Sequence, residues 1–298
     1  MELPMAAVLS SSRLYRSNEV STGEWNNEHD KQPKAKDEIR LESMMDPLFT
    51  CSIDDGHPSD MKTAELLQKH DLSGTFFVPI RNCEGDEVLS DEKIRELGRR
   101  FEIGSHTYDH RYLKKVDIWQ AYHQINDGKK YLEDVLGKQV NGFCYPGGRY
   151  RKRDVELVHA CGFTYARTTM NLCFDAGNRP YEMPTTVQFY PHDRAVYLRN
   201  FAGSGNWLRR ANGLQLAIQN GDWMRRMYAM FDHAARTGGT FHLWGHSKQF
   251  DELDAWKQLD AFFAHVACQI ATQNRLTNEE LAARSLWTPE SARVAKPA

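Results

Sequence analysis

Two adjacent carboxylates near residue 55 are the first residues in this 298-residue chain whose types suggest chemistry. Residues 52–57 read Ser-Ile-Asp-Asp-Gly-His and follow an apolar run. Side chains alternate faces along a strand, but a glycine lets the chain turn sharply at its end. Asp54 and Asp55 can therefore face one pocket, although Asp-Asp-Gly is also an ordinary surface turn.

Two histidines four residues apart form the second motif. Residues 104–110 read Gly-Ser-His-Thr-Tyr-Asp-His, so His106 and His110 would lie on one side of a single helical turn. Two histidines and one carboxylate with an open position form a catalytic metal set. A pair of surface histidines is the alternative, and the aspartate motif favours the metal.

Two further segments end in residues suited to catalysis. Residues 143–148, Phe-Cys-Tyr-Pro-Gly-Gly, predict a strand that enters a tight turn, where the amide of Gly147 can donate to a developing oxyanion. Residues 240–247 predict a strand followed by His246, a candidate general acid. His242 is its rival, because strand alternation places both histidines on one face.

The elements that must position these residues alternate in type. Apolar runs predict strands, and helical spacing predicts the segments between them. We expect strands over 48–53, 74–80, 101–104, 142–145, 163–166 and 239–244, and helices over 60–70, 91–99, 117–136, 151–160, 207–237 and 251–272. Residues 170–205 lack clear periodicity, so we expect irregular strands among loops there. This alternation is typical of a parallel α/β sheet or barrel, in which sites lie at strand ends.

Composition bounds the class of protein. Hydrophobic residues make up 41% and charged residues 26% of the chain, as in a globular domain with a substantial core. The net charge is −2 with both signs interspersed, so we expect neither nucleic acid nor a membrane anchor. The six cysteines are scattered, and we interpret them as free thiols of a cytoplasmic protein.

The order of the four motifs resembles the polysaccharide deacetylase family, also called the NodB-homology domain or carbohydrate esterase family 4, in a divergent bacterial branch. The resemblance covers about residues 47–275. It implies a single domain folded as a distorted (β/α) barrel with mainly parallel strands. We expect a polar arm over residues 1–46 and a tail over 276–298.

The resemblance also implies roles for individual residues. Asp54 would be the general base, and Asp55, His106 and His110 would bind one divalent metal ion, with zinc expected and cobalt or nickel compatible. His246 would protonate the leaving nitrogen. The activity implied is hydrolysis of the acetyl group of an acetylated sugar or glycan.

The chain departs from the family pattern at its third and fourth motifs. Cys144 stands where the family often has an arginine that tethers the base, and Arg167, at the end of the next predicted strand, is a candidate substitute. The fourth motif is not recognisable, and the role of Asp175 in that region is left open.

The substrate is less defined than the metal set. We expect Tyr145, Trp244 and His192 to contact it, because aromatic faces suit sugars. Two other functions stay open: hydrolysis of a different C–N bond, such as a formamide or a cyclic ureide, and non-catalytic carbohydrate binding. Oligomerisation is compatible with the sequence.

Overall fold

The computed structural model describes residues 46–286, which all lie in one compact unit, Met44–Ala298. The predicted arm, residues 1–46, therefore lies outside the described residues except for Asp46. Residues 287–298 of the predicted tail also lie outside them.

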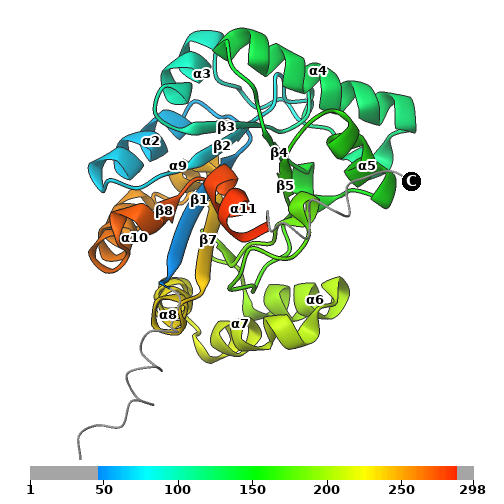
Figure 1. Ribbon diagram of the computed structural model, residues 1–298. Coiled ribbons are helices and arrows are strands. Elements are labelled where there is room, and N and C mark those ends of the chain that lie inside the picture. Colours follow the sequence, from blue (N-terminus) through cyan, green and yellow to red (C-terminus); the bar gives the residue numbers. More distant parts are fainter. Residues whose placement is uncertain (1–45, 287–298) are drawn as a thin grey trace, which may run out of the picture. The chain divides into compact units, whose positions relative to one another are not determined.

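A parallel sheet forms the centre of the fold (Figure 1). Its strand order is β5-β4-β3-β2-β1-β7-β6, and β8 pairs with β1. The strands are β1 (Leu48–Asp54), β2 (Thr75–Val78), β3 (Glu102–Ser105), β4 (Gly142–Cys144), β5 (Tyr165–Arg167), β6 (Val187–Gln188), β7 (Thr240–Gly245) and β8 (Arg275–Leu276). Six of the seven residues of β1 are buried, as expected for a strand covered on both faces.

One short segment joins the two edges of this sheet. Met183 pairs with Arg167 at the end of β5, and Val187 and Gln188 pair with β7. The backbone amide of Thr186 also donates to the carbonyl of His242 at 2.9 Å. The sheet therefore curls into a distorted barrel, and the predicted fold class is confirmed.

Helices connect consecutive strands, and those whose ends the sequence marks clearly agree best with the prediction. Asp117 caps α4 by accepting a hydrogen bond from the amide of Gln120 at 2.9 Å, and Gly137 ends it with a left-handed φ of 65°. The helices are α2 (Asp60–Lys69), α3 (Asp91–Gly98), α4 (Ile118–Leu136), α5 (Lys152–Ala160), α6 (Arg194–Ser204), α7 (Trp207–Gln219), α8 (Trp223–Thr237), α9 (Ser247–Glu252), α10 (Trp256–Gln269) and α11 (Asn278–Leu286).

The structure corrects the prediction in three segments. The helix expected over 207–237 is two helices, because Asp222 caps a new helix by accepting from the amide of Arg225 at 2.8 Å. The helix expected over 251–272 is likewise divided into α9 and α10. Residues 170–205, expected to be loops and strands, also contain α6.

The last described helix closes the amino-terminal end of the barrel. Thr50 donates to the side chain of Asn278 at 2.8 Å, and the amide of Asn278 donates to Thr75 at 2.9 Å. Leu281 and Ala282 are buried against the interior. The predicted boundary at residue 275 therefore falls short, since β8 and α11 continue the structured part to Leu286.

Candidate metal centre

The predicted chemical residues gather at the opposite, carboxyl-terminal end of the strands, where parallel α/β folds place their sites. A cavity of about 470 Å³ opens there. The predicted residues that line it are Asp54, Asp55, His106, His110, Gly147, His192, Trp244 and His246.

Asp55, His106 and His110 converge on one point. Their ligand atoms all lie within 4.8 Å of one another. The Nε2 atoms of His106 and His110 are 3.5 Å and 3.2 Å from the same oxygen, Oδ1 of Asp55. Two imidazoles and a carboxylate in this arrangement are the donor set of a catalytic metal site with open positions.

The backbone that carries these side chains is unusual. Asp55 and His110 have positive φ angles of 77° and 56°, and Thr107 between the histidines has 68°. Non-glycine residues seldom occupy this region, and those that do cluster at functional sites. The prediction of a helical turn at His106–His110 is therefore wrong: the segment is a loop, because left-handed residues interrupt any helix.

Hydrogen bonds to α4 hold this loop in place. The amide of Tyr108 donates to the backbone carbonyl of Gln124 at 2.8 Å. The amide of Asp109 donates to Oε1 of the same glutamine at 2.8 Å. The two imidazoles thus meet through fixed loop geometry, with ring centroids 5.1 Å apart.

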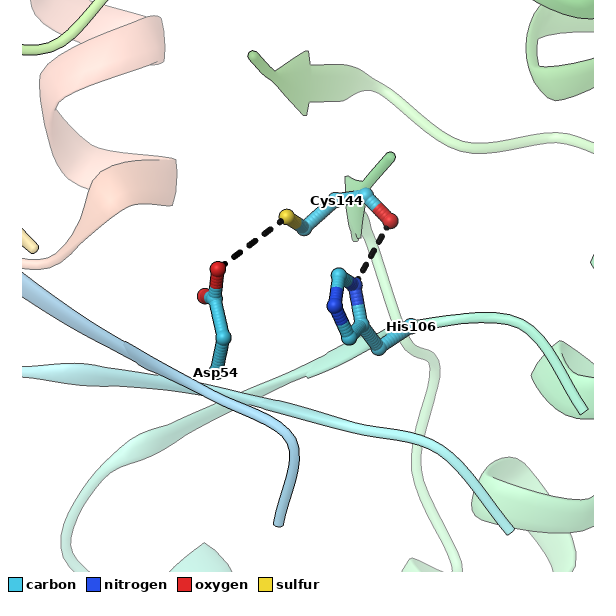
Figure 2. A group of neighbouring side chains, drawn as sticks. All are labelled: Asp54, His106 and Cys144. Carbon is cyan, nitrogen blue, oxygen red and sulfur yellow. Dashed lines mark hydrogen bonds between the residues drawn. The ribbon is translucent and has the colours of Figure 1, made fainter. Parts of the chain in front are cut away.

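The tautomer of His106 follows from its second nitrogen. Its Nδ1 lies 2.8 Å from the carbonyl oxygen of Cys144, so Nδ1 carries the proton and donates it (Figure 2). Nε2 is then left with a lone pair that faces Asp55. Metal-binding histidines are commonly fixed in this way by a carbonyl behind them.

The electrostatics of Asp55 also suit a cation. Burial alone would raise the pKa of Asp55, but the adjacent imidazoles of His106 and His110 and the charge of His246 hold it well below its ordinary value. Its Oδ1 is buried without a geometrically adequate hydrogen-bond partner among the described residues. A buried carboxylate oxygen without a hydrogen bond is unfavourable unless another group binds it. The ligand atoms of His106 and His110 beside it fit a divalent metal ion.

Asp54 is held by a different residue. Its Oδ1 accepts a hydrogen bond from Nη2 of Arg167, and both side chains are almost fully buried. Although burial opposes the charge on the guanidinium, Asp54 raises the pKa of Arg167. The rings of Phe77 and Trp244 lie 5.2 Å and 5.1 Å from the guanidinium carbon and cover the cation further. Arg167 thus reaches Asp54 from the end of β5.

Cys144 contacts both Asp54 and the metal-ligand candidate His106. Its thiol donates to Oδ2 of Asp54 at 3.7 Å, while its carbonyl accepts from His106 (Figure 2). Burial raises the pKa of the Cys144 thiol well above its ordinary value, so the sulfur stays protonated. Asp54, His106 and Cys144 also lie close enough to one another to hold an ion, but the cation Arg167 already occupies Asp54.

The two rival histidines of β7 have different surroundings. His246 follows the strand, lines the cavity, and has its Nε2 3.7 Å from Oδ2 of Asp55. His242 is buried within the strand, where its Nε2 lies 3.0 Å from the hydroxyl of Ser52. Burial, together with Arg167, lowers the pKa of His242 well below its ordinary value and keeps the ring neutral. The alternation argument fails because β7 ends at Gly245, before His246.

A chain of polar side chains supports His246. Its Nδ1 lies 3.1 Å from Oε1 of Gln249 and 3.3 Å from Nε2 of Gln188. Gln188 in turn accepts from Nε2 of His192 at 2.8 Å. Burial and the nearby Arg226 lower the pKa of His192. His192 therefore contacts the residues that orient His246, as well as lining the cavity.

Two residues of the prediction lie away from the cavity. Tyr145 is fully buried, its hydroxyl donates to the carbonyl of Tyr181 at 3.1 Å, and its ring stacks on Tyr150. It does not line the cavity, so the expected contact with substrate is corrected to a core role. Asp175 pairs with Arg209 outside the cavity.

The sequence alone did not identify several lining residues. They come from the loop after β2, from the loop after β3 and from α6, whose place in the fold no motif marks: Glu84, Tyr112, Tyr197, Arg199 and Asn200. The hydroxyl of Tyr112 donates to Glu84 at 3.1 Å. Only the irregular, aromatic-rich character of residues 170–205 signalled that this region could contribute to a site.

Comparison with known proteins supports the family resemblance. Residues 44–166 match the family model described as polysaccharide deacetylase. The predicted resemblance to the polysaccharide deacetylase family is confirmed. The matched residues end in β5. They include the two motifs that contain Asp54, Asp55, His106 and His110, together with the Pro-Gly-Gly turn, and they do not include His246.

Two individual proteins match parts of the chain. The uncharacterized protein YlxY of Bacillus subtilis is 29% identical over 97 residues, which are 33% of this chain and 30% of YlxY. The peptidoglycan-N-acetylglucosamine deacetylase PgdA of Listeria monocytogenes is 30% identical over 130 residues, 42% of this chain and 25% of PgdA. The chain thus spans less than a third of either relative.

A family 4 acetyl xylan esterase from Clostridium thermocellum, in complex with a cobalt ion, aligns with a TM-score of 0.49 at 15% identity. The alignment covers 80% of this chain and 91% of the esterase.

Two further expectations concern the rest of the chain. All six cysteines lie among the described residues and are free, as predicted. No helix between residues 46 and 286 is both long enough and apolar enough to cross a membrane.

Proposed function

We propose that this protein is a metal-dependent deacetylase that hydrolyses the acetyl group of an acetylated sugar or glycan. The convergence of Asp55, His106 and His110 on one buried oxygen, with Asp54 directly beside them, carries the proposal. Membership of the matched segment in the polysaccharide deacetylase family supports it.

Asp55, His106 and His110 would hold the metal through one carboxylate oxygen and two Nε2 atoms. A divalent cation in such a site polarises a carbonyl oxygen and lowers the pKa of a bound water molecule. Zinc fits two imidazoles and a carboxylate, and cobalt and nickel are compatible with the same donors.

Asp54 is the residue placed to accept the proton of the attacking water. Its Oδ1 is occupied by Arg167, and among residues 46–286 its Oδ2 receives only the weak thiol hydrogen bond of Cys144. Asp54 would therefore act as the base, and Arg167 would hold it in place. The family more often holds its base with an arginine at the position that Cys144 occupies here.

His246 is placed to deliver a proton to the leaving nitrogen. Its Nε2 faces the metal ligands, and Gln249 accepts from Nδ1 on the other side of the ring. Gly147 lines the same cavity and would present its amide to the oxygen that develops negative charge. A general acid and an oxyanion donor in the same cavity would complete the groups needed for hydrolysis.

The substrate class rests on the relatives. PgdA is described as a deacetylase of the N-acetylglucosamine of peptidoglycan, and 130 residues of this chain match it at 30% identity. We therefore expect N-acetylated sugars to be turned over before formylated sugars or cyclic ureides.

Product analysis tests the proposal. Zinc-loaded protein is incubated with N-acetylglucosamine oligomers, N-formylglucosamine and a cyclic ureide, and acetate, formate and ring opening are measured. We expect acetate from the oligomers. In Asp54→Asn the rate should fall by about 10²–10⁴-fold with metal retained, because the base is lost while the ligands remain.

Asp175→Asn is the matched control, because Asp175 is an aspartate paired with an arginine outside the cavity. It should keep the wild-type rate. Turnover of the oligomers by Asp54→Asn at the wild-type rate would refute the role of Asp54. Formate or ring opening without acetate would refute the deacetylase assignment.

A further inference from the structure

Four cations from two distant segments lie together beside the cavity. Lys114 and Lys115 belong to the loop after β3, and Arg149 and Arg151 follow the Pro-Gly-Gly turn. The amide of Lys114 donates to the carbonyl of Arg149 at 3.1 Å, and Nη2 of Arg151 donates to the carbonyl of Lys114 at 2.6 Å. We call these four residues, all of them exposed, the cationic rim.

The cationic rim adjoins the cavity through Tyr112. Tyr112 and Gly147 line the cavity, and each precedes a rim residue closely in the chain. Nζ of Lys115 lies 5.0 Å from the centroid of the Tyr112 ring, and the guanidinium carbon of Arg149 lies 5.4 Å from it. A molecule that extends from the cavity past Tyr112 therefore meets the rim.

The charge of the rim is not neutralised within the described part of the chain. None of its four residues forms an ion pair there, although the chain as a whole has a net charge of −2. The nearest acidic residues in sequence form other contacts: Asp117 caps α4 by accepting from the amide of Gln120, and Asp154 is buried and bonded to Arg153. Glu84, on the cavity side, accepts the hydroxyl of Tyr112 instead. Four adjacent unpaired cations create a local positive potential that attracts a polyanion.

We propose that the cationic rim binds an anionic glycan, in which sugar units with negative charges flank the acetylated unit in the cavity. This proposal rests on the proposed deacetylase function, because that function supplies the unit in the cavity. It narrows the proposed substrate class from acetylated glycans in general to glycans that also carry negatively charged sugar units.

The contacts favour a glycan over a single-stranded nucleic acid. Proteins bind single strands by stacking bases on exposed aromatic rings beside cations. Lys115 and Arg149 already lie over the ring of Tyr112, the aromatic ring within the rim, so a base would have to displace a cation to stack there. The rim therefore provides cationic groups but no free aromatic ring on which a base could stack.

A binding experiment with the full-length protein tests the proposal without requiring turnover. Polygalacturonate, neutral dextran and polyuridylate are the probes, each measured at 50 mM and 200 mM salt. The test variant is Lys114→Gln/Lys115→Gln/Arg149→Gln. The matched control is Arg99→Gln/Arg100→Gln/Lys257→Gln, which removes the same charge from exposed residues that do not line the cavity.

We expect wild-type protein and the control to bind polygalacturonate and not dextran. If three cations contact the polyanion, the fourfold rise in salt should weaken binding about 20-fold. The rim variant should lose at least about 10-fold in affinity at the lower salt concentration, with unchanged metal content and thermal midpoint.

Equal affinity of the rim variant and the control for polygalacturonate would overturn the proposal. So would rim-dependent binding of polyuridylate without binding of polygalacturonate, which would assign the rim to nucleic acid. The outcome is separate from that of the proposed function: absence of acetate release would refute the deacetylase, whereas the binding assay would still report on the rim.

Discussion

Replacing Arg167 by methionine should destabilise the protein strongly, because it leaves the buried Asp54 without its cation. Arg167 and Asp54 have exposed side-chain fractions of 0% and 3%, so water cannot compensate for the missing partner. Breaking a buried ion pair by removal of one partner costs about 3–5 kcal/mol. We expect a loss of this size in the free energy of unfolding at pH 7, a large part of a typical domain's stability.

Urea denaturation of the metal-free protein measures this loss, and a double-mutant cycle assigns it. Asp54→Asn in the Arg167→Met background removes the unpaired charge, so at least about half of the lost stability should return. Arg209→Met is the matched control: its partner Asp175 is half exposed, and surface pairs contribute only about 0–1 kcal/mol.

Equal stabilities of Arg167→Met and the double variant would show that the two side chains are not coupled. A loss in Arg167→Met no greater than that in Arg209→Met would refute the reasoning as well. Either result would remove the argument that Arg167 holds the base in place of a residue at position 144.

The remaining predictions concern the barrel interior and the acid. Burial raises the pKa of Glu102 to about 7, although Thr75 and Tyr165 donate to it. This raised pKa contributes stability that is fully present below pH 4 and is lost as the pH rises through 7, by at most about 3 kcal/mol. Glu102→Gln should not show this loss when the free energy of unfolding is measured by urea denaturation from pH 4 to pH 8. The same pH dependence in the wild type and in Glu102→Gln would contradict the prediction. Gln249→Leu should lower kcat about 10–100-fold with little change in KM, since His246 loses its orienting partner; an unchanged pH–rate profile would argue against that role.

The sequence predicted best what local chemistry determines. The strands that carry Asp54, His106 and Cys144 were located because apolar runs and glycine turns mark them, and α4 because Asp117 and Gly137 mark its ends. The order of the motifs along the chain then pointed to the family resemblance, and the resemblance implied roles for their residues. The predicted motifs and the predicted strands agree because each motif lies at the end of a strand.

Other features depend on contacts between distant residues, which a single sequence does not reveal. Closure of the barrel depends on Met183–Gln188 pairing with both edges, and α11 depends on bonds from Thr50 and Thr75, more than 200 residues away. Left-handed φ angles at Thr107 and His110 replaced the expected helical turn. The cationic rim was missed for the same reason, because its two segments are about 35 residues apart.

Metal content tests the central claim most directly. Wild-type protein, His106→Ala and His123→Ala are purified in parallel, loaded with zinc, dialysed and analysed for bound metal. His123 is an exposed histidine of α4 outside the cavity and serves as the control. We predict about one zinc ion per chain in the wild type and in His123→Ala, and a loss of stoichiometric metal in His106→Ala. Equal metal content in all three proteins, or none in the wild type, would contradict a metal centre at Asp55, His106 and His110.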